Sequence, residues 1–164
     1  MFRFILSSLF LAQLVMSGFL RVENPEPGRW YEMGSFGVGG RVVVEMDSQQ
    51  SSELELKLGN SQGDIIFHLV ADEGITKIST SLSEEEVKTT SLSASGLKEL
   101  VVEVQSEGVF VDLVGSGSVV LPYPADSWTG NRNKAWDSVD SITRVYVGGR
   151  GVKFIRLAAH VLVF

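Results

Sequence analysis

The sequence predicts an all-β protein, folded as an antiparallel sandwich or barrel. Apolar and charged residues alternate without error at 53–59, where Leu54, Leu56 and Leu58 share one face. This period of two is typical of a strand with one face on a core and the other in water. Similar short runs recur along the chain, and each is bounded by Gly, Asp, Asn, Ser or Pro.

The predicted strands follow one another at the spacing of an antiparallel sandwich or barrel. Besides 53–59, they lie at 41–47, 64–70, 75–80, 98–105, 108–114, 118–123, 142–147 and 152–157. The chain has 164 residues, which is enough for one domain with a sizeable core. Its 44% apolar and 21% charged residues are typical of a globular protein.

Short segments between the strands are predicted as turns. The glycines at 34–40 do not indicate a phosphate-binding loop, because a strand follows them where a nucleotide site requires a helix N-terminus. The segment 115–118 separates two strand patterns and predicts a hairpin turn. At 81–88, Ser83 and Glu86 fit a capping box, but no apolar helical face follows. One helical turn or an extended hairpin tip is expected there.

The longest irregular segment, 122–141, contains Trp128 and Trp136 in a polar setting. Long loops often bind ligands, but such tryptophans also fold back over a sheet edge, and both alternatives stay open. The apolar tail at 158–164 is predicted to pair inside the sandwich or to be buried in a homodimer, because a free apolar strand edge invites association.

The N-terminus has the form of a secretory signal peptide. Arg3 is followed by an uncharged apolar run from Phe4 to Leu20 and then by polar residues. We therefore expect a signal peptide at 1–18, a sandwich domain at 24–164 and a secreted, extracellular protein. The alternative is an uncleaved anchor, since the run is only slightly shorter than the roughly 20 residues of a spanning helix.

The charge of the chain argues against two classes of partner. The formal net charge is -6, and no segment clusters Lys and Arg enough to overcome it. Neither nucleic acid binding nor membrane insertion after signal removal is expected. The chain has no cysteine, so an exported protein must rest on its hydrophobic core instead of disulfides. No motif indicates a cofactor.

His68 is one of only two histidines, and it lies within an apolar, strand-like run. Residues two apart on a strand share a face, so Ile65, Phe67 and Leu69 are predicted to face the core. His68 then lies on the outer face of the sheet, either in a binding surface or in ordinary solvent.

Catalysis and metal binding are not predicted. The sequence has no Gly-x-Ser-x-Gly elbow around which a serine hydrolase would be built, and the alternation of strands and helices that carries such an elbow is missing. A metal site formed by Asp64, His68 and Asp72 would need three side chains four residues apart to converge, and a strand spreads them too far.

The chain resembles the galectins, a lectin family whose fold is a two-sheet, antiparallel, jelly-roll-like sandwich of the concanavalin-like kind, and the resemblance implies this fold. The stretch FGVGGRVVVEMDSQQSSELELKLGNSQGDIIFHLVADEG is similar to the early strands of the family, which end in Asp-Ile-x-x-His-Phe-Asn-Pro-Arg. SASGLKELVVEVQSEGVFVDLVGSGSVVLPYPADSW resembles its later strands. DSVDSITRVYVGGRGVKFIRL resembles its closing strands and is the most specific match.

The resemblance carries the galactose-contacting histidine of the family onto His68. Val70 and Asp72 then stand at the places of an asparagine and an arginine, and Ile78 stands near another asparagine place. Counting back from Gly96 assigns three more places, the stacking tryptophan, the glutamate and the second arginine, which fall on Leu82, Glu85 and Val87.

The resemblance therefore implies a carbohydrate-binding site that has lost most of its polar and aromatic groups. The expected site residues are His68, Asp72, Glu85 and, from the long loop, Trp128. The predicted function is a secreted galectin-like lectin module with a degraded β-galactoside site, a glycan or glycoconjugate as its partner and no enzymatic activity. The alternative is a galectin-fold module for protein interaction or structure that binds no sugar.

Overall fold

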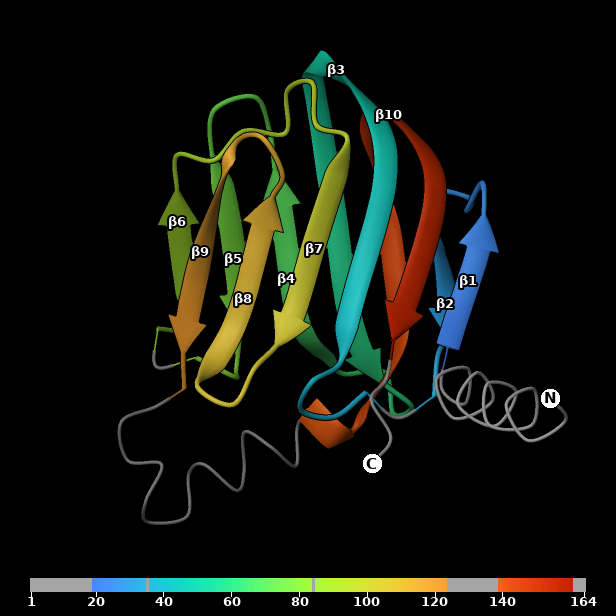
Figure 1. Ribbon diagram of the computed structural model, residues 1–164, viewed down its shortest axis with the longest axis vertical. Helices are drawn as coiled ribbons and strands as arrows, with labels where there is room; N and C mark the ends of the chain where they lie inside the picture. Colours follow the sequence, from blue (N-terminus) through green and yellow to red (C-terminus); the bar gives the residue numbers. More distant parts are fainter. Residues whose placement is uncertain (1–18, 35, 84, 124–138, 161–164) are drawn as a thin grey trace, which may run out of the picture.

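The computed structural model describes residues 19–34, 36–83, 85–123 and 139–160. In these residues ten strands form one continuous antiparallel sheet that curves into two layers (Figure 1). The predicted all-β, antiparallel sandwich is confirmed. No helix among the described residues is both long enough and apolar enough to cross a membrane.

The ten strands follow one another along the chain. They are β1 (Phe19–Glu23), β2 (Arg29–Glu32), β3 (Arg41–Asn60), β4 (Ile65–Ala71), β5 (Thr76–Thr80), β6 (Val87–Thr90), β7 (Glu99–Val104), β8 (Gly108–Leu113), β9 (Gly117–Pro122) and β10 (Ile142–His160).

Two long strands, β3 and β10, take part in both layers (Figure 1). The front layer contains β9, β8, β7, the first half of β3, the second half of β10 and β1. The back layer contains β6, β5, β4, the second half of β3, the first half of β10 and β2. Because β3 and β10 pair with each other along almost their whole length, they join the two layers by folding over one end of the sandwich.

The fold-over is the bend where β3 and β10 pass from one layer to the other. It is irregular on β3, and buried serines hold it in place. Ser48 pairs with Val152 and Glu53 pairs with Arg150, so residues 49–52 of β3 stand opposite Gly151 alone. The hydroxyls of Ser48 and Ser52 both donate hydrogen bonds to the carbonyl of Ala94, in the β6–β7 connection. These bonds satisfy polar groups that the bend buries, and they fix the bend to the neighbouring loop.

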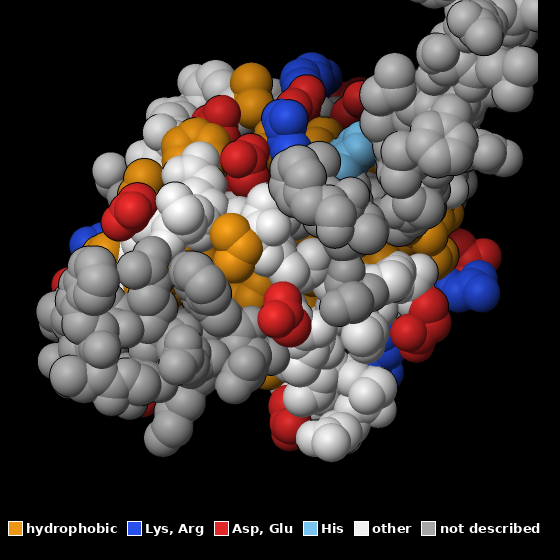
Figure 2. Space-filling model, turned by 60° about the horizontal axis from the view of Figure 1, so that its bottom comes forward, with side chains coloured by type: hydrophobic (Ala, Val, Ile, Leu, Met, Phe, Trp, Pro, Cys, Tyr) orange, Lys and Arg blue, Asp and Glu red, His pale blue; other side chains and the backbone are white. Residues whose placement is uncertain are grey.

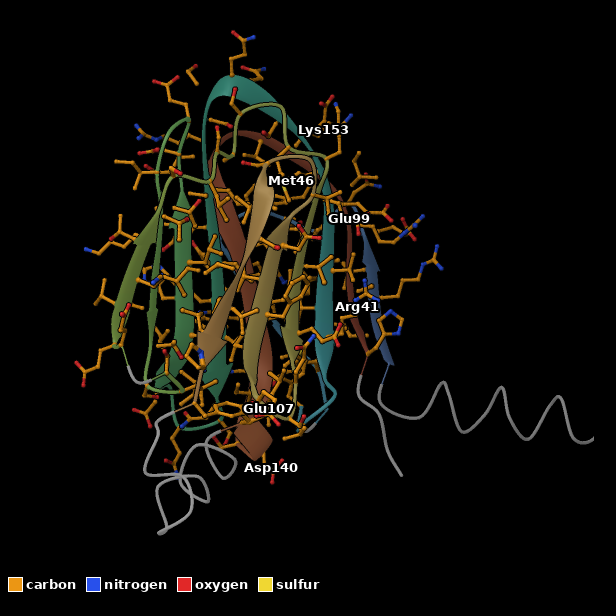
Figure 3. All side chains as sticks on the ribbon, turned by 60° about the vertical axis from the view of Figure 1, so that its left-hand side comes forward. Arg41, Met46, Glu99, Glu107, Asp140 and Lys153 are labelled. Carbon is orange, nitrogen blue, oxygen red and sulfur yellow. The ribbon has the colours of Figure 1, made fainter. Side chains whose placement is uncertain are left out.

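The core fills the space between the layers. The front half of β3 contributes Val42, Val44 and Met46, and its back half contributes the predicted core residues Leu54, Leu56 and Leu58, all at most 1% exposed. In Figure 3 Arg41 and Glu99 extend from the outer side of the front layer. The period of two therefore sorts side chains between core and solvent as the sequence predicts.

Two differences from the predicted strands concern continuity and edges. The predicted strands 41–47 and 53–59 are one strand, β3, and 142–147 and 152–157 are one strand, β10. The pairing of β3 with β10 on both sides of the fold-over keeps each chain extended through it. The structure also contains β1, β2 and β6, short strands that lie at the sheet edges and carry little alternation.

The turns agree with the sequence. The 115–118 segment closes the hairpin of β8 and β9, where the N–H of Ser116 donates to the carbonyl of Leu113 at 2.8 Å. The described residues of 81–86 form no helix, and they connect the antiparallel strands β5 and β6 as a hairpin tip. The glycine-rich 34–40 segment leads directly into β3.

The two ends of the described chain lie side by side in the front layer. β1 begins at Phe19, before the predicted domain boundary at 24, and pairs with the end of β10. Ala158 and Ala159 of the apolar tail also pair with β3 inside the sheet. The predicted signal peptide at 1–18 and residues 161–164 lie outside the described residues.

Replacing Gly149 by alanine is expected to destabilise the fold-over. Gly149 has φ of 132°, and an added Cβ would collide with the carbonyl oxygen of Glu53 on the paired strand. We expect a loss of about 2 kcal/mol or more in the free energy of unfolding, measured as a lower melting temperature. Gly74→Ala is the control, because no heavy atom lies within 4 Å of the added Cβ. Equal melting temperatures for both variants would contradict the role of Gly149.

Candidate functional site

One row of paired residues crosses the outer face of the back layer on all six strands. Lys57 on β3 pairs with His68 on β4 and with Tyr146 on β10. The row continues from these residues to Ser79 and Val87 in one direction and to Trp30 in the other. Paired residues of adjacent strands point to the same face, so these side chains form one surface.

The middle of the row is an ionic group built around Glu55, which stands two residues before Lys57 on β3. His68 Nε2 lies 2.7 Å from Glu55 Oε1, and Lys57 Nζ lies 3.1 Å from the same oxygen. The side chains of His68, Lys57 and Glu55 are 32%, 22% and 24% exposed. One half-buried carboxylate therefore holds two basic groups in place.

The pKa of Glu55 reflects this arrangement. Burial raises the pKa of its carboxyl, but the hydrogen bonds from His68 and Lys57 together outweigh burial and hold the pKa below its ordinary value of 4.5. The carboxylate is therefore charged at neutral pH, and its charge orients the basic groups beside it.

The other end of the row is aromatic and cationic. The rings of Trp30 and Tyr146 have centroids 5.5 Å apart and are tilted by 52°. The Arg144 guanidinium carbon lies 4.8 Å from the centroid of Trp30, and Lys57 Nζ lies 4.5 Å from the centroid of Tyr146. At these distances the cations are attracted to the ring faces. We call Glu55, Lys57, His68, Trp30, Tyr146 and Arg144 the outer-face cluster.

Glycines leave room for both rings. A Cβ on Gly148 would lie 2.8 Å from the hydroxyl oxygen of Tyr146, and a Cβ on Gly59 would lie 3.2 Å from the six-membered ring of Trp30. Side chains at either position would push the rings away from the sheet. The glycines therefore allow the rings to lie close to the backbone.

A groove of about 410 Å³ lies at the β4–β6 end of the same face. Ile65, His68, Ser79 and Val87 line it together with Thr80, Ser81 and Glu86. Ile65 was predicted to face the core, and this prediction is wrong: its side chain is 49% exposed. The cause is a register shift between β3 and β4, where Leu58 pairs with Phe67 but Gly59 pairs with Ile65.

The structure distributes the predicted site residues over different places. His68 lies on the outer face, as the alternation predicts, and Val70 and Val87 also lie there. Asp72 lies at the end of β4, where its carboxylate accepts hydrogen bonds from the N–H groups of Gly74 and Ile75 at 3.0 and 2.8 Å. These two bonds lower the pKa of Asp72, and its charged carboxylate stabilises the turn that follows β4.

Of the residues assigned by counting back from Gly96, Val87 lines the groove beside His68, but Leu82 and Glu85 do not. Leu82 is completely buried, so its assignment to the stacking place is wrong. Glu85 lines a separate cavity of about 130 Å³ between β6 and β9, where it forms an ion pair of 3.5 Å with Lys88. Trp128 lies outside the described residues.

The sequence patterns did not indicate five residues of the cluster: Trp30, Tyr146, Arg144, Lys57 and Glu55. The signal that could have found Lys57 and Glu55 was the polar face of 53–59, where they alternate with core leucines. Tyr146 and Arg144 alternate in the same way with Val145 and Val147. Only the register brings these residues together, because they come from strands far apart in the chain.

The molecule does not present one large field of a single sign in the view of Figure 2. On that face acidic and basic side chains lie interspersed with hydrophobic and uncharged ones. Local clusters, and not a global field, therefore determine what a described surface attracts.

The outer-face cluster is suited to binding and orienting a polar ligand. The aromatic rings supply apolar contact, and Arg144 and Lys57 supply charged hydrogen-bond donors beside them. This combination of aromatic surface and charged donors is what recognition of a sugar requires, because a sugar ring has apolar patches between its hydroxyls.

The fold that carries this surface is a galectin-like β-sandwich, as the sequence resemblance predicted. Sheep galectin-11, in a complex with glycerol, superposes with a TM-score of 0.59 at 15% identity over 82% of this chain and 98% of that chain. Caenorhabditis elegans galectin LEC-6 has a TM-score of 0.55 at 14% identity, over 85% of this chain and 94% of its own. Chicken galectin 2 has a TM-score of 0.55 at 15% identity, over 85% and 96%.

The likeness in structure is accompanied by low sequence identity. No family profile matches the sequence, and no curated protein sequence matches it. At identities of 14% to 15% the superpositions establish the fold alone. The chain is therefore a divergent example of the galectin-like fold.

Glu55→Gln is expected to flatten the acid dependence of stability. The lowered pKa of Glu55 means that its contribution is fully present above pH 4.5 and is lost as the pH falls through the folded-state pKa. The variant should melt below the wild type at pH 7, and the difference should shrink below about pH 4.5, as measured by thermal melts followed by circular dichroism. Glu107→Gln is the control, an exposed carboxylate with no ion pair among the described residues. A constant difference down to pH 3 would contradict the role of Glu55.

Proposed function

We propose that this chain is a secreted carbohydrate-binding module, a lectin with a galectin-like fold and a degraded β-galactoside site. In this proposal its ligand is a glycan or glycoconjugate, which binds on the outer face of the back layer. The observation that carries the proposal is the outer-face cluster, where Trp30 and Tyr146 lie beside Arg144 and Lys57.

The galactoside site implied by the resemblance lacks the aromatic ring and the charged donors that bind a galactoside. A galactoside needs an aromatic face for the apolar side of its ring and charged donors for its axial hydroxyl. Val70 offers no donor, and Asp72 is engaged by its own turn. Among the described residues that line the groove beside His68, none is Trp, Tyr or Phe.

In this proposal the binding site lies at the aromatic end of the row and not beside His68. Trp30 and Tyr146 are half-buried, so part of each ring remains accessible to a ligand. Lys57 belongs to both ends, because it contacts Glu55 beside His68 and covers Tyr146. A ligand at the aromatic end would meet rings and charged donors within three neighbouring strands.

Secretion and the absence of catalysis belong to the same proposal. The apolar run from Phe4 to Leu20 behind Arg3 supports export, since it has the form of a signal peptide. The cluster supports binding, because its groups are aromatic rings and paired charges. His68, the group best suited to acid–base work, is bonded to Glu55 on the neighbouring strand.

Lactose is expected to bind very weakly or not at all. A missing stacking ring and missing charged hydrogen bonds each remove roughly 1 kcal/mol or more, and about 1.4 kcal/mol is a tenfold loss of affinity. Isothermal titration calorimetry with lactose measures this directly. Affinity typical of a lectin that His68→Ala abolishes would show that the galactoside site is intact and would refute its degradation.

A glycan array is expected to give specific binding that depends on the aromatic end of the row. Trp30→Ala removes one ring and the support of Arg144, so the affinity for the array hit should fall about tenfold or more. Phe110→Ala is the control, because it removes a half-buried aromatic side chain from the outer row of the front layer. Affinities are measured by calorimetry on variants whose melting temperatures match the wild type.

One result would overturn the lectin proposal, and a second would overturn only the assignment of the site to the outer-face cluster. If no glycan binds to the folded protein, the module for protein interaction or structure is the better interpretation. If a glycan binds but Trp30→Ala leaves its affinity unchanged, the chain is a lectin whose site lies away from the cluster.

A further inference from the structure

We propose that the glycan bound by the outer-face cluster carries an anionic group, a carboxylate or a sulfate, and that Arg144 binds this group. The inference rests on the proposed function, because it names the class of sugar that the cluster takes. Its basis is the position of the Arg144 guanidinium between the Trp30 ring and the backbone of Asn60.

The guanidinium of Arg144 is held in place before any ligand arrives. Its Nε donates to the carbonyl of Asn60 at 3.0 Å, and its carbon lies 4.8 Å from the centroid of Trp30. Asn60 is itself fixed, because its side-chain oxygen accepts hydrogen bonds from the N–H groups of Gln62 and Asp64 at 3.0 and 2.9 Å. A group that is already ordered loses less conformational entropy when it binds.

No hydrogen bond joins either terminal nitrogen of Arg144 to another described residue. In residues 19–34, 36–83, 85–123 and 139–160, no carboxylate forms an ion pair with Arg144. By contrast, Arg150 further along β10 is paired with Glu53. Because Nε is already bonded to Asn60, the two Nη groups form the free fork, and a fork of N–H donors matches the oxygens of a carboxylate or a sulfate.

The cations also decide what kind of sugar reaches the rings. Arg144 lies over Trp30, and Lys57 lies over Tyr146. A neutral sugar would have to displace a cation to stack on either ring, and it would lose a cation–π contact. An acidic sugar binds the cation where it lies and contacts the exposed parts of the rings.

The charge of the rest of the chain does not favour the binding of acidic sugars. The whole chain has a net charge of -6, which repels anions in general. Glu32 stands directly opposite Arg144 on β2, although the two form no ion pair. A preference for acidic sugars would therefore come from the cluster itself, and removing the charge of Glu32 should strengthen it.

The test compares acidic and neutral forms of the same sugars by calorimetry on the secreted chain. The probes are 3′-sulfated lactose against lactose, and trigalacturonate against its methyl ester. If the array selects another glycan, its acidic and neutral forms are compared in the same way. Sodium sulfate at the same concentrations separates binding of a free anion from binding of an acidic sugar.

We expect the acidic member to bind at least about tenfold more tightly than its neutral partner. Arg144→Met should remove this preference, and Glu32→Gln should increase it. Arg150→Met is the matched control, because it removes the same charge from an arginine that is 84% exposed and already paired, and it should keep the preference. Arg144→Lys, which keeps the charge but not the fork, should retain only part of it and serves if Arg144→Met does not fold.

The inference is overturned, and the lectin proposal survives, if neutral and acidic forms bind equally. It is also overturned if Arg150→Met lowers the preference as much as Arg144→Met, since the effect would then be one of net charge. Tight binding of sodium sulfate alone would assign Arg144 to a free anion. If no glycan of either kind binds the folded chain, the proposed function fails together with this inference.

Discussion

The pairing of β3 with β10 is the constraint on which the rest of the structure depends. Each strand runs through both layers, so their fold-over determines how the front layer lies on the back layer. The bend needs backbone without a side chain at Gly149, and the hydroxyls of Ser48 and Ser52 bind it to the carbonyl of Ala94 in the β6–β7 connection. The same pair then provides the centre of the outer-face row, because Lys57 and Tyr146 are paired residues of β3 and β10.

Alternation in the sequence predicted the fold class and much of the core, because the period of two records which face of each strand meets the opposite layer. Leu54, Leu56 and Leu58 are buried as predicted. Ile65 was assigned wrongly because a register shift turns it to the other face of the sheet. The local sequence pattern does not reveal such a shift. The continuity of β3 was missed for a similar reason: residues 49–52 have the composition of a turn, and the long-range pairing on either side keeps the strand extended.

The candidate site could be predicted only in part. The orientation of His68 followed from local alternation, but its partner Glu55 comes from a neighbouring strand, and the register of that pair is a property of the whole sheet. Counting from Gly96 failed for Leu82 because this residue lies in the connection between β5 and β6 and is buried there. Trp30 and Tyr146 are more than a hundred positions apart in the chain, so nothing local indicates that their rings meet.

The geometry of the sheet explains how a binding face can change while the fold persists. Core residues such as Leu56 and Val147 are constrained by both layers, because a change in their volume is felt across the sandwich. Their neighbours Lys57 and Tyr146 point the other way and are constrained only by cross-strand contacts on one surface. Side chains on this outer surface can thus change without altering the packing between the layers. A chain at 14% to 15% identity to galectins can in this way keep their sandwich and carry a different set of outer-face side chains.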